Sequence, residues 1–119
     1  MTVVRAYDGT HEPGAYRILV DRLWPRGVSK DAAALDEWST DLAPTSDLRR
    51  WYGHDPAKFP EFRQRYRDEL DRAPASDVVD HLVAIAADRP VALVTATRDV
   101  QHSGATVLRE LLLERLGAL

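Results

Sequence analysis

A short apolar run near the C-terminus constrains the fold more than any other stretch of the sequence. Residues 91–94 read Val-Ala-Leu-Val, with Pro90 before them and Thr95 after them. Such a run is typical of a central strand in a parallel sheet, because both faces of that strand are covered. Parallel strands need long connections, and helical patterns lie on both sides of this run. We therefore predict an α/β fold: a compact single domain with a small, mainly parallel sheet flanked by helices, in Rossmann-like layering.

The remaining sequence supplies the other strands and the helices. Residues 16–21 begin with a β-branched and apolar run that predicts a second buried strand, and residues 2–6 predict an opening strand. Helices are predicted where apolar side chains recur at spacings of three and four, or where a capping residue precedes a helical pattern. Their expected ranges are 30–34, 46–52, 56–70, 76–89 and 104–116, with Ser29, Thr45 or Ser46, and Asp55 capping the first three and Ser76 opening the fourth.

Residues 35–43 fit two structures. Leu35, Trp38 and Leu42 have helical spacing, whereas the polar residues after Trp38 and the stop at Pro44 suit a strand. We expect a short strand, and the helix stays open as the alternative.

The loop at residues 21–27 breaks the strand pattern and concentrates unusual chemistry. Pro25 cannot donate a hydrogen bond to a strand ladder, so the strand must end before it. Gly27 supplies the conformational freedom for a turn. The loop places a carboxylate, two guanidiniums and an indole at the C-terminal end of a strand: Asp21, Arg22, Arg26 and Trp24.

A second loop, residues 95–103, follows the apolar strand. The carboxyl ends of parallel strands meet at one edge of a sheet, where ligands bind, so we expect the two loops to meet there. The closing helix points its free N–H groups and positive dipole end at the same edge. The sequence therefore predicts an anion-binding or phosphate-binding site. The candidate anion-binding residues are Arg22, Arg26, Arg49, Arg98 and Ser103, and the candidate catalytic residues are Asp21, His102 and Asp99.

Each candidate also has a purely structural interpretation. Asp21 could pair with an arginine or cap a turn, and Trp24 could anchor the core. His102 and Ser103 could form no more than a helix cap. The sequence has no glycine-rich phosphate loop, nucleophile elbow or two-histidine zinc helix. Asp99 with His102 is too small a ligand set for a metal, so no metal is predicted, and the cofactor is unknown.

Composition narrows the class of protein. The 119 residues are 45% hydrophobic and 29% charged, as in an ordinary globular domain. No apolar run approaches the ~20 residues that a membrane span needs, and the N-terminal residues lack a signal-peptide layout, so we expect a cytoplasmic protein without a membrane partner. The absence of cysteine excludes disulfides and thiol catalysis. A net charge of −3 argues against bulk nucleic-acid binding, although a local basic patch could still bind nucleic acid.

Several motifs together resemble a known family. They are residues 19–30, 42–45 and 48–51, the helical Phe62, Tyr66, Glu69 and Leu70, and the closing Asp99, His102, Ala105 and Leu108. Over nearly the whole chain they closely resemble the YeaO-like branch of the domain-of-unknown-function family 488, so residues 1–119 are expected to form a single YeaO-like domain. The resemblance implies a compact α/β domain with a partly parallel sheet, and it favours the strand within residues 35–43. The family carries no settled activity, so the resemblance implies no reaction.

The resemblance also bears on the second loop. Elsewhere in the family a cysteine-containing segment follows the last strand, whereas residues 95–103 contain no cysteine here. The YeaO-like pattern usually has asparagine at the position of Ser103 and lysine at that of Arg98. These differences keep the loop polar and charged, but they weaken the assignment of a defined step to one side chain.

Three functions remain open at this point. The first is a small enzyme acting on a nucleotide or another phosphorylated compound, with Asp21 as general base and His102 as acid or orienting group. The second is a non-catalytic module that binds nucleic acid or protein through residues 49–52, where basic and aromatic side chains alternate. The third is a structural role, in which a buried ion-pair network joins Arg22, Arg26 and Arg49 to Asp21, Asp99 and Glu69. The oligomeric state is left open.

Overall fold

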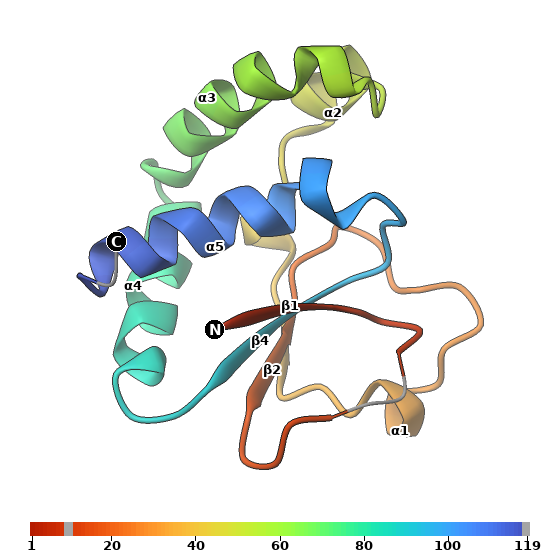
Figure 1. Cartoon of the computed structure of the whole chain (residues 1–119), viewed down its shortest axis with the longest axis vertical. Coiled ribbons are helices and arrows are strands. Elements are labelled where there is room, and N and C mark those ends of the chain that lie inside the picture. Colours follow the sequence, from red (N-terminus) through yellow and green to blue (C-terminus); the bar gives the residue numbers. More distant parts are fainter. Residues whose placement is uncertain (9–10, 118–119) are drawn as a thin grey trace.

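Four strands, all parallel, form one sheet in the order β1-β4-β2-β3 in the computed structural model, which describes residues 1–8 and 11–117 (Figure 1). The central strand β4 (Val91–Thr95) lies between β1 (Thr2–Arg5) and β2 (Tyr16–Leu19), and β3 (Glu37–Trp38) pairs with the outer side of β2. Each position of β4 is buried. The predicted parallel sheet around residues 91–94 is confirmed.

Helices connect these strands and cover mainly one face of the sheet. Figure 1 shows α5 lying across the sheet, where it contacts β1 and β4, and α3 and α4 pack against α5. The short α1 lies apart from these helices. The helix bounds are α1 (Lys30–Ala33), α2 (Ser46–Tyr52), α3 (Phe59–Leu70), α4 (Ala75–Ala86) and α5 (Gly104–Arg115), with 3₁₀ turns η1 (Thr40–Leu42), η2 (Pro56–Lys58) and η3 (Val100–His102).

The strand periodicity divides the core into two clusters. Ile18 and Leu93 point into the larger cluster, together with buried side chains of α3, α4 and α5. Leu19 and Val94 point to the opposite face, because successive side chains of a strand alternate between the faces of the sheet. Trp24 packs against this second, smaller cluster. The predicted compact α/β domain is therefore confirmed. In the described part of the chain, no helix is long and apolar enough to span a membrane.

Two predicted strands end earlier than the sequence suggested. The opening strand stops at Arg5 and the second strand at Leu19, although Ala6 and Val20 still donate backbone hydrogen bonds to the carbonyls of Thr95 and Val94. Strand pairing ends before Asp21, whose side chain bonds to the residues at the end of β4. The prediction of a strand over residues 16–21 was therefore too long at its C-terminal end.

The expectation of a strand within residues 35–43 is correct only for Glu37 and Trp38. These residues pair with β2, and Ser39 N–H still donates to the carbonyl oxygen of Leu19. A 3₁₀ turn then buries Leu42 completely. The first part of the segment pairs as a strand and the second part buries a side chain in a helical turn. Its sequence pattern therefore fitted both a strand and a helix.

The helix that was predicted to open at Ser76, α4, begins one residue earlier, at Ala75. Ser76 lies inside the helix, where its N–H donates to the carbonyl oxygen of Arg72 at 2.9 Å, and Pro74 occupies the capping position. For α2, where two residues were possible, Thr45 is the cap: its hydroxyl oxygen accepts the N–H of Leu48. Gly53 ends α2 in the left-handed region with φ 55°, a backbone conformation that favours glycine.

Candidate functional site

A pocket of about 530 Å³ opens at the C-terminal edge of β2 and β4. Its walls come from the loop after β2, the loop after β4, the start of α5, and α2 with the residues that flank it. The two loops that follow parallel strands therefore meet at one edge, as the sheet topology predicted. Of the candidate residues, this pocket is lined by Asp21, Arg22, Arg26, Arg49, His102 and Ser103.

Asp21 joins the two loops. Its Oδ1 accepts the hydroxyl proton of Thr95 at 2.7 Å, and its Oδ2 accepts the N–H of Ala96 at 2.7 Å. Burial raises the pKa of Asp21 above its usual value, while the hydrogen bonds from Ala96 and Thr95 act in the opposite direction. No arginine of the described residues forms an ion pair with Asp21, so the carboxylate is held by neutral donors.

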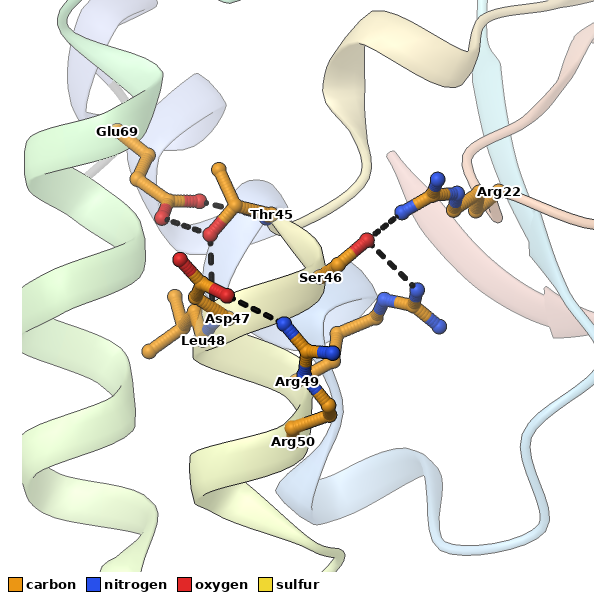
Figure 2. Close-up of polar contacts among 8 residues, drawn as sticks. All are labelled: Arg22, Thr45, Ser46, Asp47, Leu48, Arg49, Arg50 and Glu69. Carbon is orange, nitrogen blue, oxygen red and sulfur yellow. Dashed lines mark hydrogen bonds and ion pairs between the residues drawn. The ribbon is translucent and has the colours of Figure 1, made fainter.

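Two guanidiniums that line the pocket converge on one hydroxyl oxygen, that of Ser46, which is not itself part of the lining. Figure 2 shows the side chains of Arg22 and Arg49 pointing at Ser46 from different elements. Arg22 Nη1 donates to Ser46 Oγ, and Arg49 Nη2 approaches the same oxygen at 3.5 Å. A neutral hydroxyl cannot compensate the charge of either guanidinium, so this corner of the pocket is strongly cationic.

The nearby carboxylates serve other partners. Glu69 Oε1 and Oε2 accept the N–H and the hydroxyl of Thr45 at 2.9 and 2.7 Å, and Asp47 pairs with Arg50 (Figure 2). Among the described residues, Arg22 and Arg49 form no ion pair. No carboxylate of the described residues therefore compensates their positive charge.

Arg26 adds a third cation to the pocket lining. Its side chain is exposed and forms no ion pair with a described residue. The backbone around it is tied to the end of β1, because Tyr7 Oη donates to the carbonyl oxygen of Arg26 at 3.2 Å. Arg98, by contrast, is exposed and lies outside the described pocket lining, so the structure does not bring it together with the other arginines.

His102 reaches the pocket with its orientation fixed. Its Nδ1 lies 2.8 Å from Asp99 Oδ2, and its ring packs edge-on against Phe59 with 5.3 Å between centroids. The carbonyl oxygen of His102 accepts the hydroxyl proton of Tyr52 at 2.6 Å. Burial, with the charges of Asp99 and Asp55, raises the pKa of the Tyr52 phenol. Asp99 itself is not part of the pocket lining, but it orients His102 and its charge acts on Tyr52, and both of these residues line the pocket.

Ser103 is occupied as a helix cap. Its Oγ donates to the carbonyl oxygen of Val100 at 2.7 Å and accepts the N–H of Thr106 at 3.4 Å. The hydroxyl therefore begins α5, as the structural interpretation of this residue anticipated. Behind it, Gly104 and Ala105 also line the pocket, and the N–H groups of a first helical turn have no intrahelical acceptor.

The structural hypothesis of a buried ion-pair network is wrong. Arg22, Arg26 and Arg49 are exposed, and among the described residues none of them pairs with a carboxylate. Asp21 and Glu69 are satisfied instead by hydroxyl and backbone donors.

Several lining residues were not identified as site residues from the sequence. They include Leu23, Trp24 and His54, whereas Arg50 and Tyr52 were considered only within the basic and aromatic stretch at residues 49–52. Trp24 was weighed as a core anchor, and it is one: its Nε1 donates to the carbonyl oxygen of Val28 at 2.6 Å, and its ring packs against Trp38 at 5.5 Å. It forms a pocket wall as well. Their position follows from tertiary packing, for which the local sequence holds no signal.

The basic and aromatic stretch at residues 49–52 is not an open stacking surface. The Trp51 ring is covered by the Arg65 guanidinium at 4.4 Å and by the Lys58 ammonium at 5.3 Å from its centroid. Lys58 Nζ also donates to the carbonyl oxygen of Trp51 at 2.9 Å. The described residues contain no group of three or more His, Cys, Asp or Glu side chains that could hold a metal ion.

Comparison with known proteins agrees with the resemblance to the YeaO-like branch of the family. The uncharacterised protein Rv3073c of Mycobacterium tuberculosis is 41% identical over 110 residues, which cover 92% of this chain and 91% of that protein. The uncharacterised protein YeaO of Escherichia coli is 36% identical over 106 residues, which cover 89% of this chain and 90% of that protein. No solved structure matches the chain. The family model described as the inactive DUF488-N3 subclade matches residues 1–118, and the chain therefore belongs to this subclade.

Proposed function

We propose that this protein binds a small phosphorylated or otherwise anionic ligand in the pocket at the C-terminal edge of its sheet. The observation that carries the proposal is the convergence of Arg22 and Arg49 on Ser46 Oγ, with no carboxylate paired to either guanidinium among the described residues. Arginine presents a planar fork of donors that matches the oxygens of phosphate or carboxylate. An anion at this position would satisfy both side chains at once.

The charge of the pocket lining supports the same function. Its described residues include Arg22, Arg26, Arg49 and Arg50, against a single acidic side chain, Asp21. Arg50 is paired with Asp47, but the other three arginines form no ion pair with a residue that the structure describes. Ser46 can turn its hydroxyl and donate to an incoming anion, because a hydroxyl is both donor and acceptor.

Binding without turnover fits the chain better than catalysis. The subclade is described as inactive, and the loop at residues 95–103 contains no cysteine. Asp21 already accepts a hydrogen bond on each oxygen, which leaves it poorly placed to take a proton from a ligand. The Asp99 and His102 pair is the observation that favours an enzyme, because it orients an imidazole into the pocket.

A thermal-shift titration with inorganic phosphate and sulfate tests the proposal. At about a hundred times its dissociation constant, a ligand adds roughly 2.7 kcal/mol, which is several degrees for a domain of this size. We expect this shift in the parent protein and its loss in Arg22→Ala and in Arg49→Ala. Arg115→Ala is the matched control, because Arg115 pairs with Asp71 and Asp80 away from the pocket. The proposal would be contradicted if the melting temperature of the parent did not rise, or if it rose as much in both pocket variants as in the parent.

The enzyme alternative has its own test. If a compound that binds in the pocket is also consumed, His102→Gln should abolish product formation while binding persists. Unchanged product formation in that variant would remove His102 from any reaction.

A further inference from the structure

The pocket carries an apolar side chain that the fold leaves uncovered. Leu23 is 71% exposed, more than the other large exposed hydrophobic residues of the described chain, Tyr7 at 49% and Trp38 at 44%. It also lines the pocket, directly beside Arg22 in the sequence. Leu23 belongs to neither core cluster. Its exposure therefore contributes nothing to the packing of the protein itself.

The segment that presents Leu23 is held in place. Pro25 is buried, and Trp24 is fixed by the hydrogen bond from its Nε1 to the carbonyl oxygen of Val28 and by the ring of Trp38. Trp38 Nε1 in turn donates to the carbonyl oxygen of Asp21 at 2.8 Å. The leucine thus sits on a braced loop, and a ligand that covers it would lose little free energy to ordering the loop.

Three apolar residues lie between two arginines along this loop. Residues 22–26 line the pocket in succession, with guanidiniums at both ends and Leu23, Trp24 and Pro25 between them. A pocket of about 530 Å³ is far larger than one phosphate ion and falls in the usual range for small-molecule sites, ~300–1,000 Å³. An inorganic anion alone would leave the apolar part of the loop in water.

We propose that the ligand is a phosphate monoester with a flat apolar body, of the class of the nucleoside monophosphates. The phosphate group would contact Arg22 and Arg49 beside Ser46, and the base would cover Leu23 and the exposed part of Trp24. This inference rests on the proposed function, since it uses the same cationic corner as the phosphate site. The same chemistry is offered by a free nucleotide and by the phosphorylated end of a nucleic-acid strand.

Isothermal titration with a graded set of probes tests the inference. The probes are inorganic phosphate, a ribose phosphate without a base, adenosine and uridine monophosphate, and a short oligonucleotide with a terminal phosphate. Covering an exposed leucine favours binding, so we expect the nucleotides to bind about tenfold more tightly than the ribose phosphate. Tighter binding of the oligonucleotide than of the mononucleotides would identify the strand end as the source, and the reverse order would identify the free nucleotide.

Leu23 variants separate the base from the phosphate. Leu23→Ser should remove the tenfold advantage of the nucleotides and leave the affinity for the ribose phosphate unchanged. Leu23→Ile keeps an apolar side chain and should retain most of the advantage. Both variants should unfold at the same urea concentration as the parent, because the side chain is 71% exposed.

The outcomes distinguish the two proposals. If nucleotides and ribose phosphate bind equally in the parent, or if Leu23→Ser leaves nucleotide binding unchanged, the base contact is refuted and the anion site stands. If none of the phosphate compounds binds the parent, the proposed function itself fails.

Discussion

Asp21 shows how one side chain can organise both loops of the pocket. Each of its oxygens accepts a hydrogen bond from the residues that follow β4, so the loop after β2 is fixed to the loop after β4. The sequence placed an acid at this edge and suggested a general base. The structure gives the carboxylate a positioning role, which depends on donors 74 and 75 residues away and could not be read from its own surroundings.

Asp21→Asn tests that role at the residue scale. An amide must present its NH₂ group to one of the two donors, so we expect a loss of about 1–3 kcal/mol in the free energy of unfolding. Burial raises the pKa of Asp21 in the folded protein, so above the ordinary carboxyl pKa of 3.8 the folded state binds the proton more tightly than the unfolded state. The stability contributed by Asp21 therefore falls as the pH rises from the ordinary pKa of 3.8 through the raised pKa of the folded protein.

The loss in the free energy of unfolding caused by Asp21→Asn should accordingly be larger near pH 3.8 than at neutral pH. Urea unfolding of both proteins across this range measures it, and asparagine does not titrate, so the difference isolates Asp21. A deficit that grows with rising pH would mean that the hydrogen bonds from Thr95 and Ala96 outweigh burial.

At the scale of the elements, the start of α2 sets the positions of the cationic side chains. Thr45 caps the helix and donates its hydroxyl proton to Glu69 of α3 at 2.7 Å, whereas the hydroxyl of the adjacent Ser46 caps nothing and accepts from the arginines. The sequence left both residues as caps, because either hydroxyl could reach an orphan N–H group. The contact with α3 decides between them, and it is a tertiary one.

Thr45→Ala and Ser46→Ala form a matched pair of variants. Thr45→Ala should lower the free energy of unfolding by about 1 kcal/mol, since it removes the cap of α2. Ser46→Ala should change the free energy of unfolding by less than ~0.5 kcal/mol, since it removes an acceptor that only the arginines use. Urea unfolding at neutral pH compares the two. A larger loss for Ser46→Ala would show that its contacts with Arg22 and Arg49 hold the helix in place.

Other elements show where sequence patterns reach their limit. The helix predicted from Ser76 exists, but it begins at Ala75, because Ser76 N–H is already used by the carbonyl oxygen of Arg72. Residues 35–43 carry both strand pairing with β2 and the burial of Leu42, so no single periodicity describes them. Element type was predictable where one face dominates the pattern, whereas boundaries were predicted correctly only in places such as α2, where a cap and a glycine mark both ends.

Across the whole molecule, the sheet topology could be predicted, and it placed the site. The apolar run at β4 predicted a central parallel strand, and parallel strands bring the loops after β2 and β4 to one edge. Which side chains of those loops enter the pocket depends on packing. Arg98 lies outside it, Ser103 is a cap, and Leu23 faces the pocket without any local signal.

The central claim is that an anion binds between the loops after β2 and β4 and the start of α2. Nuclear magnetic resonance of the isotope-labelled protein, titrated with inorganic phosphate, tests it most directly. We predict saturable shifts of the amide signals of residues 22–24, 26 and 46–50, with matching changes at residues 95–97, because these segments meet at the pocket. Shifts confined to other basic positions, such as Arg89 or Arg109, or no saturable shift at all, would contradict the account.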